Sequence, residues 1–600
     1  MDFSSFLTSL VTSFLIFLLL MILFVWLSGK TKNNVIYYPN RLIKGLDGAT
    51  GGMSNPFAWI REAVSSSEAD VIDMSGVDTA VYFVFIATVL GICVLSGVIL
   101  LPLLLPLAAT DHVIDDAKKA NGNGTFNELD KISMGNVKEK SPKLWGFLFA
   151  VYWVSLVSYF LLWKAYHHVA ELRADALMAK AAKPEQYAVL VRDIPSPPYG
   201  QSRKDQVDSF FQSIFPDSFY RSMIVTDMKQ ANKLHVELEG YKKKLARAEA
   251  DLGKSVKAGK SGSSSRPQTR DGFLGLLGKK VDSIEFFNEK IIELTTKLEK
   301  ERKVTLRDKQ QGAALVFFSN RVSAVCVGQA LPDSMVNTWT VMEAPESRQL
   351  IWHNLTIPFF ARQTRQYVIY VIVALIIMFY MIPITLITAF TTLDNLKKYL
   401  PFIKPVVKIA AIRTILEAYL PQIALIVFLA LLPTLLLFLS KQEGIPSEGH
   451  AVRATSGKYF YFTVVNVFLG VTIGGTSFQS GKDIANHPKS IVDKLANSLP
   501  KSAAFFLTFV ALKLFVGYGL ELTRLIPLII FNLKKKFLCK TEDEIKEAWA
   551  PGDLGYATRV PNDILIVTIV LCYSVISPLI LPFGALYFAI GWLVLRNQVP

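Results

Sequence analysis

Residues 502–533 read SAAFFLTFVALKLFVGYGLELTRLIPLIIFNL, an apolar run with three charged residues inside it: Lys513, Glu521 and Arg524. About 20 apolar residues cross a bilayer, so this run is long enough to span one. A charge at mid-membrane costs at least about 2.5–3.5 kcal/mol, which a protein tolerates where the charge faces a partner, the bundle interior or water. Gly517 and Gly519 lie between the first two charges and predict a kink or hinge. A bendable, water-exposed, charged helix is what an ion pathway requires.

The composition is that of a membrane protein. The chain is 51% hydrophobic and 19% charged, whereas soluble domains carry about 25% charged residues. Its net charge of +15 is better explained by basic loops that set the membrane topology and contact anionic lipid than by binding to nucleic acid. We therefore predict no nucleic-acid partner. The four cysteines show no spacing of a disulfide framework.

Apolar runs repeat along the chain, and we expect an α-helical polytopic membrane protein. The runs lie at residues 4–28, 79–109, 144–166, 366–393, 413–440, 457–478, 502–533 and 563–597. Pro578 and Pro582 break the last run, which predicts a hairpin of two short or tilted helices. The total is nine membrane helices in three parts: N-terminal spans (1–166), a cytosolic domain (167–364) and pore-forming spans (365–600). The basic loop at 29–78 belongs in the cytosol, which places the N-terminus outside.

The block 167–364 predicts a small α/β sandwich of ferredoxin or RNA-recognition type. Strands are expected at 187–194, 313–320 and 338–344, helices at 205–215 and 321–331, and the arms of a helical hairpin at 228–252 and 280–311. Phe317 and Phe318 on the middle strand could stack on RNA bases. A structural or dimerising role is the favoured interpretation, because LVFF is also a common core strand.

The tip of the long hairpin, residues 272–280, is apolar with lysines after it. We predict a membrane hook that inserts shallowly into an anionic leaflet, formed by Phe273, Leu274, Leu276 and Leu277. The alternative is a loop that packs on its own domain.

Other residues could line a polar path. Gln422 and Asn466 lie inside spans and could join Glu521, although each could instead form an interhelical hydrogen bond worth about 1 kcal/mol. Glu521 and Arg524 are three residues apart, so they could form an ion pair on one helix. The favoured interpretation puts Lys513 or Glu521 in a water-filled cavity.

The sequence does not predict an enzyme. GGTSFQSGKD at 474–483 has five residues between Gly475 and Gly481, whereas a phosphate loop has four with Ser or Thr after its lysine. No HExxH, CxxC or serine-nucleophile elbow occurs, and the histidines lack ligand spacing. We therefore predict no cofactor, no metal site and no catalytic residue.

Several motifs together resemble the OSCA family, the hyperosmolality-gated, calcium-permeable channels of plants. The similarity covers essentially the whole chain and is greatest to the branch called early-responsive to dehydration. The motifs are YYPNR (37–41), NPFAWIREA (55–63), GVDTAVYF (76–83), EAPESRQLIWHNL (343–355), LPQIALIVFLALLP (420–433), GKYFYF (457–462), LIPLIIFNLKKKFLCKT (525–541) and PGDLGYATRVP (551–561).

This resemblance implies a fold similar to anoctamins and transmembrane-channel-like proteins. It also implies a homodimer that assembles through the cytosolic domain, with one pore in each subunit. The family's pore-facing glutamate falls on Glu521, and its membrane hook matches 272–280. Another member's acidic pore position falls near Lys513, and a positive charge there would repel cations. The implied pore helices lie at 366–393, 413–440, 457–478, 502–533 and 563–577.

The family pattern has eleven spans, so two further helices are expected after the hairpin and this chain is expected to be truncated. We predict a mechanically or osmotically gated, calcium-permeable cation channel of the plasma membrane, with membrane lipids, calcium and other cations as partners. One alternative is a lipid scramblase with anoctamin-like architecture. Another is a membrane sensor or scaffold that does not conduct.

Overall fold

The computed structural model divides the chain into two compact units. The helical unit comprises Met1–Ala179, Ser456–Asn532 and Trp549–Pro600, and the mixed unit comprises Lys180–Thr455 and Leu533–Ala548. The structure describes residues 3–39, 58–111, 128–138, 140–178, 183–257, 266–270, 280–335, 337–380, 382, 428–473, 495–496, 498–550 and 552–598.

The helical unit is built from long apolar helices joined by short ones. Its longest helices are α1 (Phe3–Ser28), α6 (Val77–Ala109), α8 (Leu144–Met178), α27 (Tyr556–Ile576) and α28 (Ile580–Gln598). Shorter helices are α2 (Asn34–Tyr37), α4 (Ala58–Ser65), α5 (Glu68–Ser75), α20 (Gly470–Ile473), α23 (Ala503–Leu512) and α24 (Tyr518–Thr523). Three helices belong partly to each unit: α19 (Glu448–Thr463), α25 (Leu525–Phe537) and α26 (Glu542–Trp549).

Seven helices in the described part of the chain are long and apolar enough to cross a membrane. They are Phe6–Ser28, Val77–Ala109, Leu144–Met178, Phe359–Phe379, Pro500–Phe537, Tyr556–Ile576 and Ile580–Gln598. The helical polytopic fold is therefore confirmed, and so is the hairpin around Pro578. Its two helices have 21 and 19 residues, longer than predicted because α27 begins in the polar segment before residue 563. The runs 366–393, 413–440 and 457–478 are described only in part.

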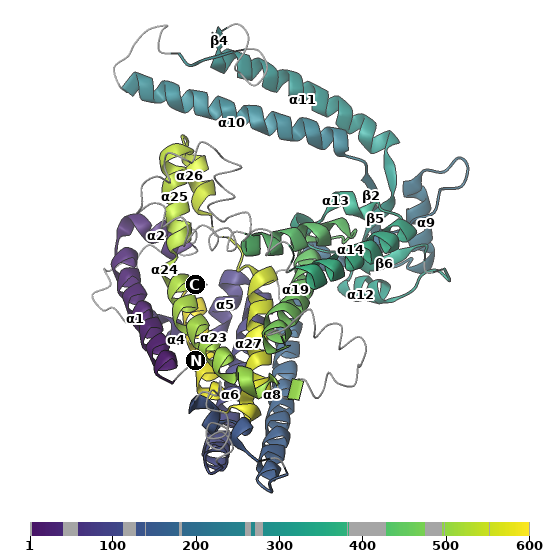
Figure 1. Ribbon diagram of the computed structural model, residues 1–600. Coiled ribbons are helices and arrows are strands. Elements are labelled where there is room, and N and C mark those ends of the chain that lie inside the picture. The colour runs from purple at the N-terminus through teal and green to yellow at the C-terminus, as the bar shows by residue number, and fades with distance from the viewer. Residues whose placement is uncertain are drawn as a thin grey trace. The chain divides into compact units, whose positions relative to one another are not determined.

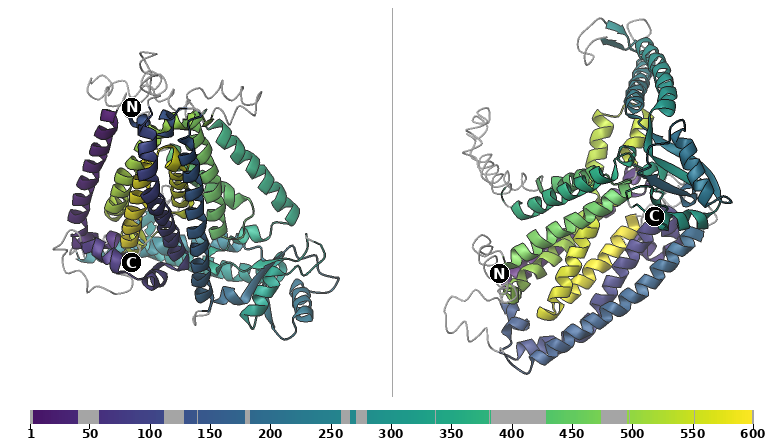
Figure 2. Two further views of the ribbon diagram at one scale, coloured as in Figure 1. Left: turned by 90° about the horizontal axis from the view of Figure 1, so that it is seen from below. Right: turned by 90° about the vertical axis from the view of Figure 1, so that its right-hand side faces the viewer.

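Glycines let the helices of this unit approach one another closely. α6 packs against both α8 and α28, and these helices lie side by side in Figure 2, with the chain ends at opposite ends of the unit. A Cβ atom on Gly91 of α6 would lie 3.3 Å from Leu161 of α8, and one on Gly146 would lie 2.6 Å from Leu107. Both contacts hold α6 and α8 closer than larger side chains would allow.

The mixed unit contains the predicted α/β sandwich. Its four strands are β1 (Ala188–Arg192), β2 (Phe219–Thr226), β5 (Gln310–Phe318) and β6 (Thr340–Glu343). Every neighbouring pair is antiparallel, in the order β2-β5-β1-β6. Helix α9 (Arg203–Ile214) joins β1 to β2, and α12 (Arg321–Gln329) joins β5 to β6. This topology is ferredoxin-like, and sequence analysis missed β2, a half-exposed edge strand with two register shifts.

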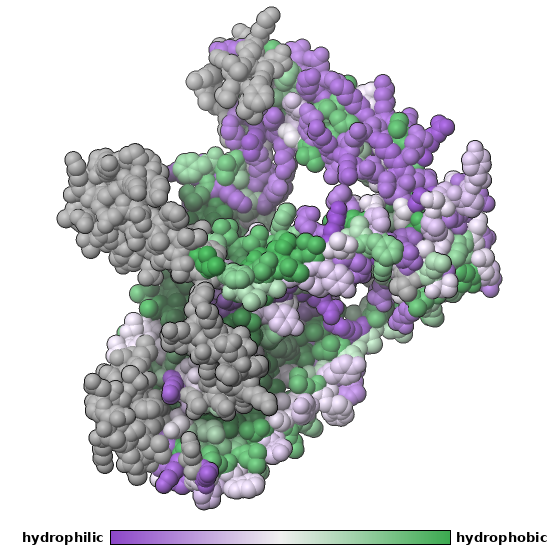
Figure 3. Space-filling view, turned by 45° about the vertical axis from the view of Figure 1, so that its right-hand side comes forward, coloured by the Kyte–Doolittle hydropathy of each residue, from purple (hydrophilic) through white to green (hydrophobic). Residues whose placement is uncertain are grey.

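A long helical pair is inserted between β2 and β5. Helices α10 (Lys229–Lys257) and α11 (Ser283–Asp308) run side by side, as Figure 1 shows, and confirm the predicted arms. Two short strands, β3 (Gln268–Arg270) and β4 (Lys280–Asp282), pair near their ends. Hydrophilic residues cover the arms in Figure 3, as their charged sequences require.

Both faces of the four-stranded sheet are covered. Val191, Val316 and Phe318 pack on the helix side with Phe211 of α9. On the other side, Leu350 and Leu355 cover β1 and β5 and contact Phe317. Phe318 therefore belongs to the core, and the face that would stack on RNA bases is occupied by the chain itself.

A buried arginine ties the sheet to the membrane-proximal segments of the mixed unit. Arg192 of β1 is 1% exposed and donates hydrogen bonds to the carbonyls of Asn354 (2.5 Å), Leu355 (3.3 Å) and Gly444 (3.4 Å). Its neighbour Asp193 forms a 3.0 Å ion pair with Arg362 of α14 (Phe359–Phe379). The sheet is thus anchored to both segments, since each buried carbonyl needs a donor. Further helices are α13 (Trp352–Leu355), α26 (Glu542–Trp549) and an apolar helix at Phe428–Gln442.

Candidate functional site

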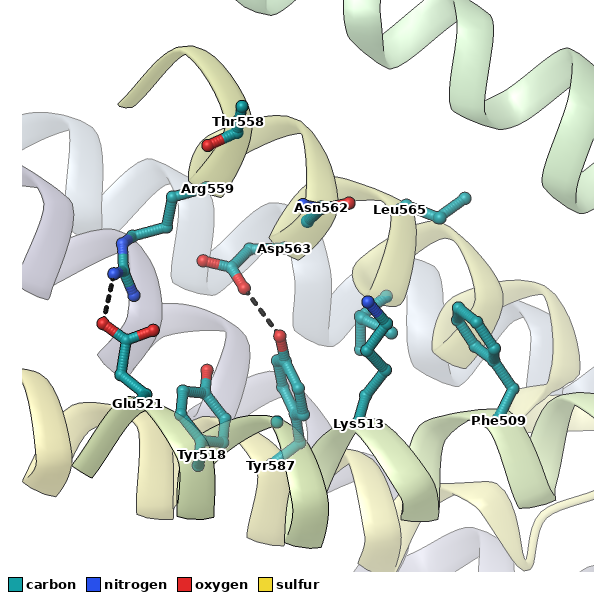
Figure 4. Close-up of a pocket in the computed structure, with 12 residues that line it drawn as sticks. Phe509, Lys513, Tyr518, Glu521, Thr558, Arg559, Asn562, Asp563, Leu565 and Tyr587 are labelled. Carbon is teal, nitrogen blue, oxygen red and sulfur yellow. Dashed lines mark hydrogen bonds and ion pairs between the residues drawn. The ribbon is translucent and has the colours of Figure 1, made fainter. Parts of the chain in front are cut away.

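A cavity of about 220 Å³ lies within the helical unit, among residues from three membrane helices. Figure 4 shows its polar side chains facing one another from the chain around Lys513, from α27 and from α28. The lining residues are Phe509, Lys513, Gly517, Tyr518, Glu521, Thr558, Arg559, Asn562, Asp563, Leu565, Ile566 and Tyr587.

Local helix geometry places two of the three charges of the 502–533 run, Lys513 and Glu521, in this cavity. Between α23 and α24 the chain forms a π-helical segment at Lys513–Gly517. Such a segment inserts extra backbone into an α-helix and often marks a functional site. Lys513, Gly517 and Glu521, four residues apart, all line the cavity. We predicted that Lys513 or Glu521 faces a water-filled cavity, and in the structure both residues line the same cavity.

Glu521 forms an ion pair with a residue that sequence analysis did not consider. Its carboxylate lies 2.5 Å from Nη2 of Arg559 on α27, and both side chains are partly buried. Arg524 instead donates from Nη1 to the carbonyl of Ile36 at 2.6 Å. The alternative of a Glu521–Arg524 pair within one helix is therefore wrong.

A buried aspartate joins three helices beside this ion pair. Asp563 of α27 is 4% exposed and accepts hydrogen bonds from the hydroxyl groups of Tyr82 on α6 and of Tyr587 on α28, the latter at 2.9 Å. Charge-assisted bonds of this kind are stronger than neutral ones. They explain how a carboxylate is accommodated among apolar helices.

Lys513 differs from the other charged residues of the cavity. Within the described part of the chain it forms no ion pair, and its Nζ atom lies 5.8 Å from the centre of the Phe509 ring. The cavity thus holds two carboxylates and two cations. Only one cation is neutralised by direct contact, which leaves Lys513 as an unpaired positive charge.

The regular helix is interrupted a second time at Arg524, after the π-helical segment that ends at Gly517. Arg524 has φ 44° and ψ 34°, a left-handed conformation that is uncommon outside glycine, and it separates α24 from α25. The hydroxyl of Tyr37 donates to the carbonyl of Thr523 at 2.7 Å, so a carbonyl freed by the break has a donor. The break is therefore stabilised from the segment after α1.

The two glycines have different surroundings. A Cβ atom on Gly517 would meet nothing within 4 Å, whereas one on Gly519 would lie 2.8 Å from Leu20 of α1. Gly519 is therefore a helix-packing position, and Gly517 is the glycine that borders the cavity.

Of the predicted site residues that the structure describes, Asn466 and Gly519 do not line this cavity. Asn466 lies in a π-helical segment, Val464–Leu469, and donates to the carbonyl of Phe462 at 3.2 Å. Gln422 and the four hook residues, Phe273, Leu274, Leu276 and Leu277, lie outside the described residues. Among the described residues, no group of three His, Cys, Asp or Glu side chains could hold a metal ion.

Sequence analysis missed Arg559, Asp563 and the two tyrosines that donate to Asp563, Tyr82 and Tyr587. Arg559 and Asp563 are four residues apart, which is one face of a helix. This spacing was visible in TRVPND, residues 558–563. Charged residues are common where an apolar run begins at a membrane surface, so this spacing alone did not indicate a site.

Comparisons with known proteins agree along the whole chain. One family model, described as "Late exocytosis, associated with Golgi transport", matches residues 5–165. A second, "Cytosolic domain of 10TM putative phosphate transporter", matches residues 186–354. A third, "Calcium-dependent channel, 7TM region, putative phosphate", matches residues 365–600.

Individual relatives are similar over nearly all of this chain. The Arabidopsis thaliana protein named Hyperosmolality-gated Ca2+ permeable channel 3.1 is 61% identical, over 100% of this chain and 82% of its own length. CSC1-like protein ERD4 of Brassica juncea is 60% identical over the same shares. Hyperosmolality-gated Ca2+ permeable channel 1.5 of Arabidopsis thaliana is 31% identical, over 96% of this chain and 77% of its own. This chain belongs to the OSCA family, the family of the hyperosmolality-gated Ca2+ permeable channels and CSC1-like proteins.

Proposed function

We propose that this chain forms a hyperosmolality-gated, calcium-permeable cation channel of the plasma membrane. The single observation that carries the proposal is the cavity into which Lys513, Glu521, Arg559 and Asp563 project from membrane helices. Charges inside membrane spans are costly and mark ion pathways. The names of its relatives support the same function and the stimulus.

The proposed gating step separates α24 from α27. With Glu521 bound to Arg559, the carboxylate is neutralised and attracts cations weakly. Bilayer tension favours the conformation with the larger membrane area, and widening the cavity would break this pair. The released carboxylate would then concentrate cations at the pathway.

Lys513 acts against cation entry in this proposal. An unpaired ammonium group in the pathway raises the energy of a nearby cation, because water-filled cavities screen charges incompletely. A lower unitary conductance than in a variant without this charge is the expected consequence.

Further parts of the proposal follow the family resemblance. Two subunits assemble through the cytosolic domain, each with its own pathway, and the hook at 272–280 couples the membrane to that domain. Gln422 and Asn466 would line the pathway in its open state. During gating, the helix would bend or straighten at Gly517, which borders the cavity.

The test is patch recording from liposomes that contain the purified protein while the membrane is stretched. Glu521→Gln is compared with Glu299→Gln, a matched substitution at an exposed position on α11. We expect tension-gated cation current that Glu521→Gln reduces and Glu299→Gln leaves unchanged. Transfer of fluorescent lipid without current would identify a scramblase. Neither activity from folded dimers would identify a non-conducting sensor or scaffold.

A further inference from the structure

A second cavity in the helical unit, of about 410 Å³, lies between α6, α8 and α28. It is separate from the ion-pathway site and has two chemically different ends. Phe83 and Val84 of α6, Leu161 of α8 and Trp592 of α28 form an apolar wall. Lys164, His168 and Arg596 form a basic end, with Glu68 as the acidic residue among them. A ligand that fits must combine negative charge with hydrocarbon.

The basic end is built around a fixed arginine. Arg596 is 8% exposed, and its Nε donates to the hydroxyl of Ser66 at 2.8 Å while Nη2 donates to the Ser66 carbonyl. Its guanidinium carbon lies 4.7 Å from the centre of the Trp592 ring. These contacts use two of the five N–H donors that a guanidinium carries. The side chain is therefore held in place with donors to spare.

The remaining charges at this end do not cancel. The Glu68 carboxylate lies 3.3 Å from Nε2 of His168, so it is already engaged. Lys164 is exposed and forms no ion pair with any described residue. Arg596 has the carboxylates of Glu68 and Asp70 nearby, so Lys164 is the cation at this end that no described carboxylate contacts.

Exposed aromatic residues of α8 give the depth of this end in the membrane. Tyr159, Phe160, Trp163 and Tyr166 are each at least 57% exposed. Tyrosine and tryptophan gather at the headgroup level of a bilayer, so Lys164 and His168 lie at that level. The apolar wall at Leu161 then lies on the hydrocarbon side. The basic loop before α6 assigns this end to the cytosolic leaflet.

We propose that this cavity binds one anionic phospholipid from the cytosolic leaflet. Its phosphate would contact Lys164 and Arg596, and one acyl chain would lie along the wall formed by Phe83, Leu161 and Trp592. A zwitterionic lipid would bring its own cationic group toward Lys164, which no described carboxylate pairs. A free phosphate ion would leave the apolar wall unused.

The test is native mass spectrometry of the purified full chain, titrated in detergent with dioleoyl phosphatidylserine or dioleoyl phosphatidylcholine. We expect wild type to retain the serine lipid more strongly. Lys164→Gln should weaken its binding about fivefold, which is the effect of removing one basic residue near anionic lipid. Arg173→Gln, an exposed position on α8 that does not line the cavity, is the matched control and should change nothing.

A second variant tests the apolar wall without changing the charge. Ala87 lines the cavity and is exposed, and Ala87→Phe should fill it and reduce binding of the serine lipid. Equal losses of serine-lipid binding in Lys164→Gln and Arg173→Gln would show that the lipid is attracted to the basic surface in general, and would overturn the proposal. Displacement of the lipid by millimolar inorganic phosphate would show a phosphate site instead. Equal retention of both lipids by wild type would also overturn it.

Discussion

The carboxylate of Glu521 lies 2.5 Å from the guanidinium of Arg559, and this ion pair joins α24 to α27 across the charged cavity. The two residues are 38 positions apart in the chain. The pair is partly exposed, with side-chain exposures of 30% for Glu521 and 18% for Arg559. An interaction of this kind is strong enough to favour one arrangement of two helices and weak enough to be broken during gating.

Arg559→Gln should ease channel opening. Without the guanidinium, Glu521 loses its ionic partner, and the closed arrangement loses stability relative to the open one. We expect a lower activation tension in stretched liposome patches. The open-channel cation current should also be larger, because the positive guanidinium no longer stands in the pathway.

A double-mutant cycle checks that this effect passes through Glu521. Glu521→Gln and Arg559→Gln should be coupled by about 0.5–3 kcal/mol in the free energy of opening, as contacting residues generally are. Additive effects of the two substitutions would show that the ion pair does not take part in gating.

Asp563→Ala should destabilise the helical unit. The substitution removes the acceptor for two buried hydroxyl groups, on Tyr82 and Tyr587. Hydrogen bonds to charged groups are worth about 1.5–3 kcal/mol each, so thermal unfolding in detergent should shift clearly downward. Asp563→Asn keeps one acceptor oxygen and should lose less.

The neighbouring Asn562 provides the control. Asn562 also lines the cavity but has no hydrogen bond among the described contacts, so Asn562→Ala should leave the melting temperature nearly unchanged. Similar shifts for both alanine variants would contradict the role assigned to Asp563.

Gly517→Ala and Gly519→Ala should have different effects, although the sequence presents the two glycines as one pair. At Gly519 a methyl group would lie 2.8 Å from Leu20, so α1 must move. Overpacking of this kind costs about 1–3 kcal/mol. At Gly517 the methyl group meets open space. Gly517→Ala therefore tests flexibility without overpacking: it should raise the free energy of unfolding by about 0.4–1 kcal/mol and raise the activation tension, and an unaltered tension would exclude a hinge there.

The membrane fold was predictable because the length of each apolar run can be read from consecutive residues alone. The run at 502–533 lies within the observed span Pro500–Phe537, and Lys513 and Glu521 stood out as charges inside it. The partners of these charges did not stand out. Tyr82 and Asp563 are 481 positions apart, and only the packing of α6 against the α27–α28 hairpin brings them together.

The sequence pattern also did not predict the irregular backbone segments. The residue that breaks the 502–533 helix is Arg524, which is left-handed, and the carbonyl before it, of Thr523, accepts a hydrogen bond from the distant Tyr37 hydroxyl. Strand β2 reads FYRSMIVT, in which polar and apolar residues do not alternate cleanly. Its assignment depends on pairing with β5, which lies beyond the inserted helical arms.

Arg192→Met should loosen the link between the sheet and the membrane-proximal segments. Three carbonyls, of Asn354, Leu355 and Gly444, would lose a donor, at about 1–3 kcal/mol for each one left unpaired. Burial, together with the charge of Arg362, lowers the pKa of Arg192 to about 10. The guanidinium therefore stays charged at neutral pH, and removing it removes charge-assisted bonds.

Hydrogen exchange measures this effect directly. Amide protection in segment 441–448 should fall in Arg192→Met. The control Arg221→Met lies at an exposed position on β2 and should not alter it. Unchanged exchange in Arg192→Met would show that other contacts hold the segment.

Acid should release α26 from α10 through a single carboxylate. Glu544 accepts backbone N–H bonds from Lys540 (2.8 Å) and Thr541 (3.4 Å), and it also accepts a bond from Arg247 of α10. Burial alone would raise the pKa of Glu544, but these hydrogen bonds outweigh it and lower the pKa. The folded state therefore binds its proton less readily than the unfolded state. This contribution to stability is complete above the ordinary glutamate pKa, about 4.3, and is lost as the pH falls through the lower folded value.

We expect exchange of the α26 amides, corrected for intrinsic rate, to be constant from neutral pH to about pH 5 and to rise steeply below about pH 4. Glu544→Gln should remove most of this pH dependence, because the amide side chain does not titrate. Glu547→Gln alters an exposed ion pair with Lys243, with both side chains more than half exposed. Such pairs contribute about 0–1 kcal/mol, so this variant should retain the wild-type profile. A profile that Glu547→Gln flattens as much as Glu544→Gln would assign the acid sensitivity to surface charge in general rather than to the capped, partly buried carboxylate.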